Sequence, residues 1–149
     1  MANAKIDVLG QNDFELVSSL YNQVFHPARD AAFFRRRFLG RYNGLIMAAS
    51  IDGEAAGFSL GFELKPTVFF SWLYGVLPPY RRAGIGAQMM EAVEAWSAER
   101  GYEHVRIECQ NGHRPMLHMC ISRGYDIVGV RWDGDRGENL VIFEKTMMH

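Results

Sequence analysis

An arginine pair and two glycines stand where a buried apolar segment gives way to a helical pattern. The stretch reads Arg81-Arg82-Ala83-Gly84-Ile85-Gly86. The first N–H groups of a helix have no intrahelical partner, and they carry about half a positive charge. Arginines before such a helix start, with glycines that leave the backbone uncovered, suit a phosphate or pyrophosphate group. The loop is therefore predicted to bind an anion.

Other phosphate-binding motifs fit this chain less well. The Gly-x-x-x-x-Gly-Lys-[Ser/Thr] pattern is absent from the sequence, and Gly84-Ile85-Gly86 lacks the third glycine of the dinucleotide fingerprint. The sequence thus disfavours ATP and NAD as the ligands of this loop.

Apolar periodicity and turn residues predict the elements that must position the loop. Asp52-Gly53 favours a two-residue hairpin turn. Asn12 followed by Glu15 resembles a capping box, and Asp30 is a candidate cap for a second helix. The predicted strands are residues 4–9, 45–51, 55–64, 67–76, 103–109, 125–132 and 139–145, and the helices follow Asn12 and Asp30 and span residues 84–100 and 115–123. The order βααβββαβαββ defines a mixed α/β fold.

Residues 76–87 resemble motif A of the GCN5-related N-acetyltransferase (GNAT) superfamily. Its Arg-x-x-Gly-x-Gly core is matched in full by residues 81–86. Gly124-Tyr125 is similar to a later signature, in which a helix ends in Gly followed by Phe or Tyr. The element order is also that of the family. The resemblance implies a single GNAT domain over residues 1–149, with a mixed, mostly antiparallel central sheet flanked by helices.

The resemblance implies that acetyl-CoA binds in a V-shaped opening between the fourth and fifth strands. The backbone near Gly75 and Val76 would pair with the pantetheine arm, and the amides of residues 82–87 would hold the pyrophosphate. Asn111, just after the fifth strand, resembles an asparagine that often contacts the pantetheine. The implied cofactor-binding residues are Gly75, Val76, Arg81, Arg82, Ala83, Gly84, Ile85, Gly86, Ala87 and Asn111.

The sequence departs from the family at the catalytic acid. Many members carry a tyrosine five residues before the aromatic of the Gly-aromatic signature, where it protonates the departing thiolate. Counting back from Tyr125, that position is Cys120. A thiol with a reference pKa of ~8.5 is mostly protonated at neutral pH, so Cys120 is a candidate acid. The alternative, which is favoured, is a small buried residue of the helix.

A general base is needed to turn an ammonium ion into the free amine that attacks a thioester. Glu108, on the fifth predicted strand beside the proposed cleft, is the first candidate. An equally weighted alternative is that Glu108 pairs with Arg106, Arg131 or another cation on a neighbouring strand. Tyr74, on the fourth strand, is a candidate to line the cleft, although a core aromatic is the favoured interpretation.

The acceptor pocket is implied by resemblance alone. It would be built by residues 25–30, between the first two helices, and by residues 132–138 in the last hairpin. The acidic side chains of that hairpin could attract a cationic amine, but a solvated loop is favoured. The arginines of the second predicted helix, Arg35-Arg36-Arg37 and then Arg41, could form an anion site, but a solvated helix face is the favoured interpretation.

Composition excludes several classes of protein. The 149 residues hold 16 Lys and Arg against 17 Asp and Glu, a net charge of −1, which argues against a general nucleic-acid binder. The histidines lack metal-ligand spacing. Residues 1–10 lack the apolar region of a signal peptide, and the longest apolar run, residues 68–77, is too short to span a bilayer. Cys109 and Cys120 fit no disulfide framework, as expected of a cytoplasmic protein.

The sequence therefore predicts an acetyl-CoA-dependent N-acetyltransferase that acts on a primary amine of a small molecule or peptide by direct transfer. No metal, nucleic-acid or membrane partner is expected, and a homodimer is left open. The alternative is a non-catalytic acyl-CoA-binding module that serves as a sensor or a partner domain.

Overall fold

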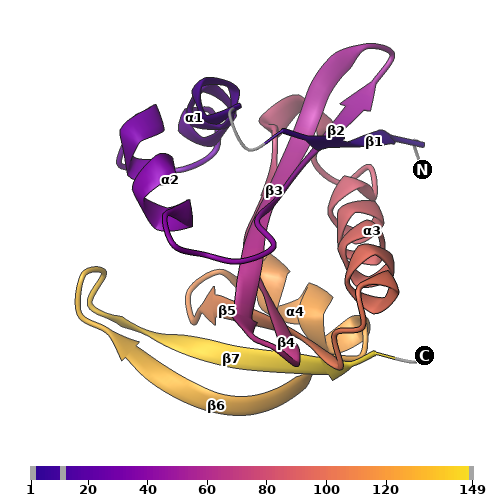
Figure 1. Ribbon diagram of the computed structural model, residues 1–149. Coiled ribbons are helices and arrows are strands. Elements are labelled where there is room, and N and C mark those ends of the chain that lie inside the picture. The colour runs from indigo at the N-terminus through magenta and orange to yellow at the C-terminus, as the bar shows by residue number, and fades with distance from the viewer. Residues whose placement is uncertain (1–2, 11–12, 148–149) are drawn as a thin grey trace.

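The computed structural model describes residues 3–10 and 13–147. Its strands form one seven-stranded sheet in the order β1-β2-β3-β4-β5-β7-β6 (Figure 1). Only β4 and β5 pair in parallel, and every other neighbouring pair is antiparallel. The strands are β1 (Lys5–Leu9), β2 (Leu45–Ile51), β3 (Glu54–Lys65), β4 (Val68–Val76), β5 (His104–Gln110), β6 (Asp126–Asp133) and β7 (Glu138–Thr146). The predicted mixed, mostly antiparallel sheet is confirmed.

Helices cover both faces of the sheet, with α1 and α2 on one face and α3 and α4 on the other (Figure 1). Asp30 caps α2 as predicted, because its Oδ1 accepts a hydrogen bond from the Phe33 amide at 2.9 Å. The predicted capping box rests on Asn12, which lies outside the described residues, and Asp13 stands at the N-cap of α1. The helices are α1 (Phe14–Asn22), α2 (Ala31–Phe38), the 3₁₀ turn η1 (Pro78–Tyr80), α3 (Ile85–Glu99) and α4 (Arg114–Ser122).

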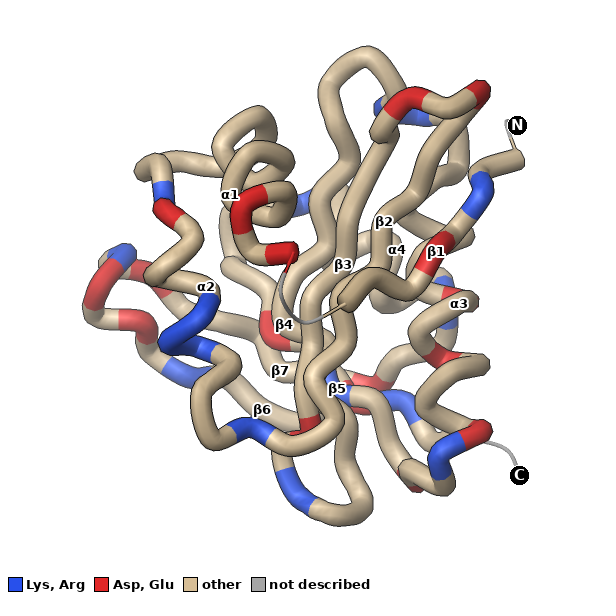
Figure 2. Tube along the Cα trace, turned by 45° about the horizontal axis from the view of Figure 1, so that its top comes forward, with Lys and Arg blue, Asp and Glu red and all other residues tan. Residues whose placement is uncertain are grey.

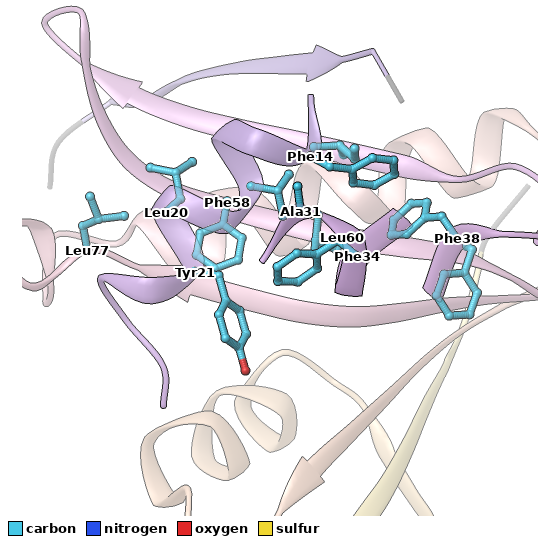
Figure 3. Close-up of a cluster of buried hydrophobic side chains, with 12 residues drawn as sticks. Phe14, Leu20, Tyr21, Ala31, Phe34, Phe38, Phe58, Leu60 and Leu77 are labelled. Atoms are coloured by element: carbon cyan, nitrogen blue, oxygen red, sulfur yellow. The ribbon is translucent and has the colours of Figure 1, made fainter. Parts of the chain in front are cut away.

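An aromatic core joins α1 and α2 to the sheet (Figure 3). Phe34 of α2 is fully buried, and its ring centroid lies 5.2 Å from that of Tyr21 in α1. Phe38 packs edge-on against Phe62 of β3 at 5.7 Å. On the opposite face, α3 buries its own apolar stripe against the same strands. Because both faces are covered, β4 is apolar in almost every position.

The strands β4 and β5 pair only at their beginnings. Residues 68–70 of β4 face residues 104–106 of β5. Beyond Phe70, β4 stays paired with β3 as far as Val76, while β5 stays paired with β7 as far as Gln110. The register between β3 and β4 also shifts around Trp72. The two parallel strands therefore part at their C-terminal ends and leave an opening in the sheet.

Candidate active site

The loop after β4 places unpaired amides at one side of this opening. Arg82 and Gly84 both have positive φ angles, 65° and 81°, and Gly84 is the N-cap of α3. The backbone N–H of Gln88 donates to the Gly84 carbonyl at 3.2 Å and makes the first hydrogen bond of the helix. The amides of residues 85–87 precede that bond, so they are free to face a ligand. The left-handed turn at Gly84 sets their direction.

The two arginines of the loop keep their charges free. Both side chains are exposed, and Arg81 Nε donates to the Val76 carbonyl at 3.3 Å. In the described part of the chain, no carboxylate lies within 4.0 Å of either guanidinium group. Burial lowers the pKa of His113, at the start of α4, and the charge of Arg81 lowers it further. The loop is therefore a local positive site.

Close packing fixes the loop against its neighbours. A Cβ atom at Gly86 would lie 3.0 Å from Met119 Cε in α4, and one at Gly75 would lie 2.3 Å from a ring carbon of Phe58. The side chain of Ile85 is buried, so only its backbone faces outward. Asn111 lies exposed just after β5, and its backbone N–H donates to the backbone carbonyl of Asn139 at 2.9 Å.

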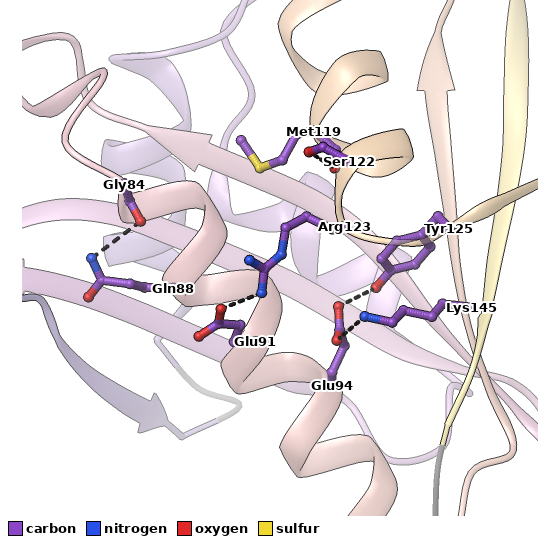
Figure 4. A network of polar contacts seen from close by, with 9 residues as sticks. All are labelled: Gly84, Gln88, Glu91, Glu94, Met119, Ser122, Arg123, Tyr125 and Lys145. Atoms are coloured by element: carbon purple, nitrogen blue, oxygen red, sulfur yellow. Dashed lines mark hydrogen bonds and ion pairs between the residues drawn. The ribbon is translucent and has the colours of Figure 1, made fainter. Parts of the chain in front are cut away.

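A polar network holds α3 in place behind the loop (Figure 4). Glu94 of α3 accepts hydrogen bonds from the Tyr125 hydroxyl and the Lys145 ammonium group, each at 2.9 Å. Glu91, one turn earlier, pairs with Arg123. Because these partners belong to β7 and to the segment after α4, the network ties α3 to the second half of the sheet.

The opening continues into a groove with a volume of about 560 Å³ on the α1–α2 side of the sheet. Both segments expected to build an acceptor pocket contribute to its walls, together with β4 and β5. Its lining includes Phe25 and Arg29 between α1 and α2, Tyr74 of β4, Glu108 of β5, and Asp133 and Asp135 of the last hairpin. The structure thus places the implied acceptor segments and the parted strands around one space.

Glu108 lines this groove and is also ion-paired. Its Oε1 accepts a hydrogen bond from Arg131 of β6 at 2.8 Å, and its Oε2 lies 3.8 Å from Arg106 Nε. Arg106 in turn lies 3.7 Å from Glu144. The pairing weighed as an alternative is therefore present, while the side chain keeps 18% of its surface exposed.

Cys120 is not among the residues that line the groove. Its side chain is fully buried in α4, in a cluster with Met90, Val105 and Tyr125. Burial raises the pKa of its thiol to about 12. A thiol with this pKa gives up its proton less readily than a free cysteine with a pKa of ~8.5.

Tyr74 both packs in the core and lines the groove, whereas the sequence favoured the core alone. Its ring packs in the core on the α3 side, as favoured, yet the residue also lines the groove where β4 and β5 part. Its hydroxyl is buried beside Ser71, and burial raises the pKa of this group, which therefore stays protonated at neutral pH.

Arginines of α2 and its C-terminal flank lie at the groove. Arg37 and Arg41 line its wall, although the sequence favoured a solvated helix face for them over an anion site. Both side chains are exposed, so that interpretation describes them correctly but incompletely. The only signal in the sequence is the mixture of arginine and phenylalanine in residues 33–41, which does not tell which surface the arginines face.

Comparisons with known proteins agree with this geometry. Residues 14–125 match the acetyltransferase (GNAT) family. An uncharacterized N-acetyltransferase of Archaeoglobus fulgidus is 31% identical over an alignment of 105 residues that covers 60% of this chain and 71% of that protein. The ribosomal-protein-S18-alanine N-acetyltransferase of Escherichia coli has a TM-score of 0.84 at 16% identity, covering 99% of this chain and 96% of that one. A GNAT family acetyltransferase of Elizabethkingia anophelis, with acetyl-CoA bound, has a TM-score of 0.77 at 14% identity, covering 98% and 99%.

The fold and the site thus define an acetyltransferase, and the chain belongs to the GNAT family. The family and enzyme class implied by the resemblance at residues 81–86 are confirmed. None of the helices in the described part combines the length and apolar character that a membrane crossing requires. Within the same residues, no three His, Cys, Asp or Glu side chains gather to hold a metal ion.

Proposed function

We propose that the protein transfers the acetyl group of acetyl-CoA directly to a primary amine of a small molecule or a peptide, in the cytoplasm. One observation carries the proposal: the strands β4 and β5 part at the place where α3 presents its unpaired amides. Membership of the GNAT family supports it. The two buried cysteines are free thiols, as a reducing compartment requires.

The residues of the opening suit acetyl-CoA, which supplies an activated acyl group when bound. The amides of residues 82–87, with Arg81 and Arg82, are the proposed pyrophosphate partners. Beyond Phe70, β4 pairs with β3 alone, so the other backbone edge of Gly75 and Val76 can hydrogen-bond to the amides of the pantetheine arm. Asn111, at the exposed end of β5, is the proposed side-chain partner of that arm.

The groove supplies the second substrate. An amine held beside the parted strands meets the thioester in the right orientation, and this proximity lowers the barrier to direct transfer. Glu108 is the proposed base that takes the proton from the ammonium ion, directly or through water. The E. coli structural relative acts on an alanine of a ribosomal protein, so a peptide terminus belongs among the acceptors tested here.

A ligand-binding measurement and a turnover measurement together test this function. Acetyl-CoA at 100 times its Kd should stabilise the protein by about 2.7 kcal/mol in a thermal-shift assay, and free CoA serves as the comparison. Incubation with a panel of amines should release free thiol. No thermal shift would contradict the cofactor assignment, whereas binding without turnover on any amine would favour the sensor or partner module.

Glu108→Gln should lower kcat/KM by about 100-fold or more, because a positioned general base contributes roughly 10²–10⁴ in rate. Raising the pH should not restore the rate if the carboxylate is the proton acceptor. Glu144→Gln is the matched control, since Glu144 shares the Arg106 partner but does not line the groove. Equal activity of the two variants would contradict the role of Glu108 as a base and would assign it only the ion pairs with Arg106 and Arg131.

Cys120→Ala should lower stability by about 1 kcal/mol and leave the turnover rate within about twofold of the wild type, because burial favours the packing interpretation. Val105→Ala, in the same buried cluster, gives the comparison for packing loss alone. Turnover is measured at a temperature where all three proteins are folded. A loss of turnover by about two orders of magnitude, confined to the Cys120 variant, would instead assign this thiol the role of proton donor.

A further inference from the structure

The floor of the groove is aromatic. Phe33 of α2, Phe62 of β3 and Trp72 of β4 all line it. Trp72 joins the other two, because its ring centroid lies 6.2 Å from those of both Phe33 and Phe62. This surface is apolar and belongs to the rigid core between α2 and the sheet. It is therefore a preformed surface for the apolar body of a ligand.

Three arginines lie against these same rings. The Cζ atom of Arg29 lies 4.6 Å from the Phe33 centroid, that of Arg37 lies 4.7 Å from Trp72, and that of Arg41 lies 4.6 Å from Phe62. Stacking on an aromatic face restricts the planar guanidinium group and leaves its N–H groups pointing sideways. Each ring of the floor thus holds one cation at the edge of the groove.

These three cations have no counter-charge of their own. Over residues 3–10 and 13–147, no carboxylate lies within 4.0 Å of Arg29, Arg37 or Arg41. The Nε atom of Arg29 is buried without a hydrogen-bond partner. Figure 2 shows the basic stretch of α2 beside the mixed charges of the β6–β7 turn. Because guanidinium groups bind carboxylates through paired, charge-assisted hydrogen bonds, this wall is suited to an anion.

Glu108 lines the same groove, and Arg131 neutralises its charge. The proposed base, the aromatic floor and the free guanidinium groups therefore line one space. Asp133 and Asp135 stand at the hairpin, so the groove also holds negative charge. The arginines of α2 and its flanks, however, are the charges that contact the aromatic floor.

From this arrangement we infer that the acceptor is an amino-carboxylate with an apolar body, of which an aromatic amino acid is the simplest example. Its carboxylate binds the guanidinium groups of Arg37 and Arg41, and its apolar body packs among the aromatic side chains that line the groove. The inference rests on the proposed function, because it names the substrate class of that site. It differs from the expectation that the acidic hairpin attracts a cationic amine.

Calorimetric titration of the CoA-saturated protein with L-phenylalanine and with L-phenylalaninamide tests the inference without requiring turnover. The two ligands share the amine and the benzyl side chain and differ in having a carboxylate or an uncharged carboxamide. Phenylalanine should bind at least 10-fold more tightly, and the double variant Arg37→Met, Arg41→Met should bind the two ligands equally. Methionine keeps an apolar stem over the rings but removes the charge.

Arg35→Met is the matched control, because Arg35 belongs to the same helix but lies over Phe14 and does not line the groove. It should retain the preference for phenylalanine. Equal binding of the two ligands by the wild type, tighter binding of the amide or of a diamine, or no binding of either ligand at 10 mM (roughly the weak limit of small-ligand recognition) would overturn the inference. Failure of the proposed function is read separately, as a lack of thiol release from acetyl-CoA with every amine.

Discussion

Gly84→Ala is expected to weaken acetyl-CoA binding by roughly 10–100-fold, because the proposed pyrophosphate site depends on the backbone at this residue. Gly84 has a φ of 81°, a left-handed conformation that a residue with a Cβ atom adopts at a penalty of about 1–2 kcal/mol. Relief of this strain turns the peptide groups that follow. The amides of residues 85–87 then lose their common direction, and the loss of one charge-assisted hydrogen bond accounts for about this change in affinity.

The matched control stands at the other end of the same helix. Gly101 follows α3 with a φ of 83°, and a Cβ atom there would meet nothing within 4 Å. Gly101→Ala should therefore lower stability by about as much as Gly84→Ala, roughly 1 kcal/mol, while acetyl-CoA binds as in the wild type. Titration of both variants with acetyl-CoA separates strain from binding. Unchanged affinity in Gly84→Ala would show that the pyrophosphate is held elsewhere.

Gly75→Ala is expected to destabilise the protein by about 3 kcal/mol and to lower its Tm by roughly 10 °C. A Cβ atom at this position would lie 2.3 Å from Phe58 Cε1 and 2.6 Å from Cζ, well inside van der Waals contact. The ring cannot move aside, since Phe58 is 1% exposed and packs in the core between α1 and the sheet. The strain falls on β4 directly beside the opening, so the cofactor site should loosen as well.

Gly129→Ala provides the comparison within another strand. A Cβ atom at Gly129 would lie 3.7 Å from Ile142 Cδ1, an ordinary contact, so its effect on stability should be within about 0.5 kcal/mol. The double variant Gly75→Ala, Phe58→Leu should be less destabilised than the sum of the two single variants, because the ring that clashes is gone. Additive effects would disprove the clash. Thermal unfolding of the wild type, the two single variants and the double variant decides between these outcomes, with Gly129→Ala measured alongside them.

The elements that local chemistry controls could be predicted closely. The hairpin turn at Asp52-Gly53 has both residues at positive φ, 51° and 82°, which that residue pair favours. The helix expected over residues 84–100 spans Ile85–Glu99, and the strand expected over residues 55–64 spans Glu54–Lys65. Each depends on periodicity and on turn or cap residues close by in the chain. The loop at residues 81–86 could be predicted for the same reason, because a helix start and its glycines are local features.

The tertiary structure decided what surrounds that loop. Glu108 meets Arg131 only because β6 and β7 join the sheet beyond β5, a strand order that no local pattern specifies. Arg37 and Arg41 face the groove because α2 packs its phenylalanines on β3 and β4, which aims the remaining surface of the helix. These neighbours are distant in sequence and meet only when the whole chain packs. The sequence by itself therefore determined the fold and the local conformation of the loop at residues 81–86, and the packing of the whole chain determined which charged side chains meet in the groove.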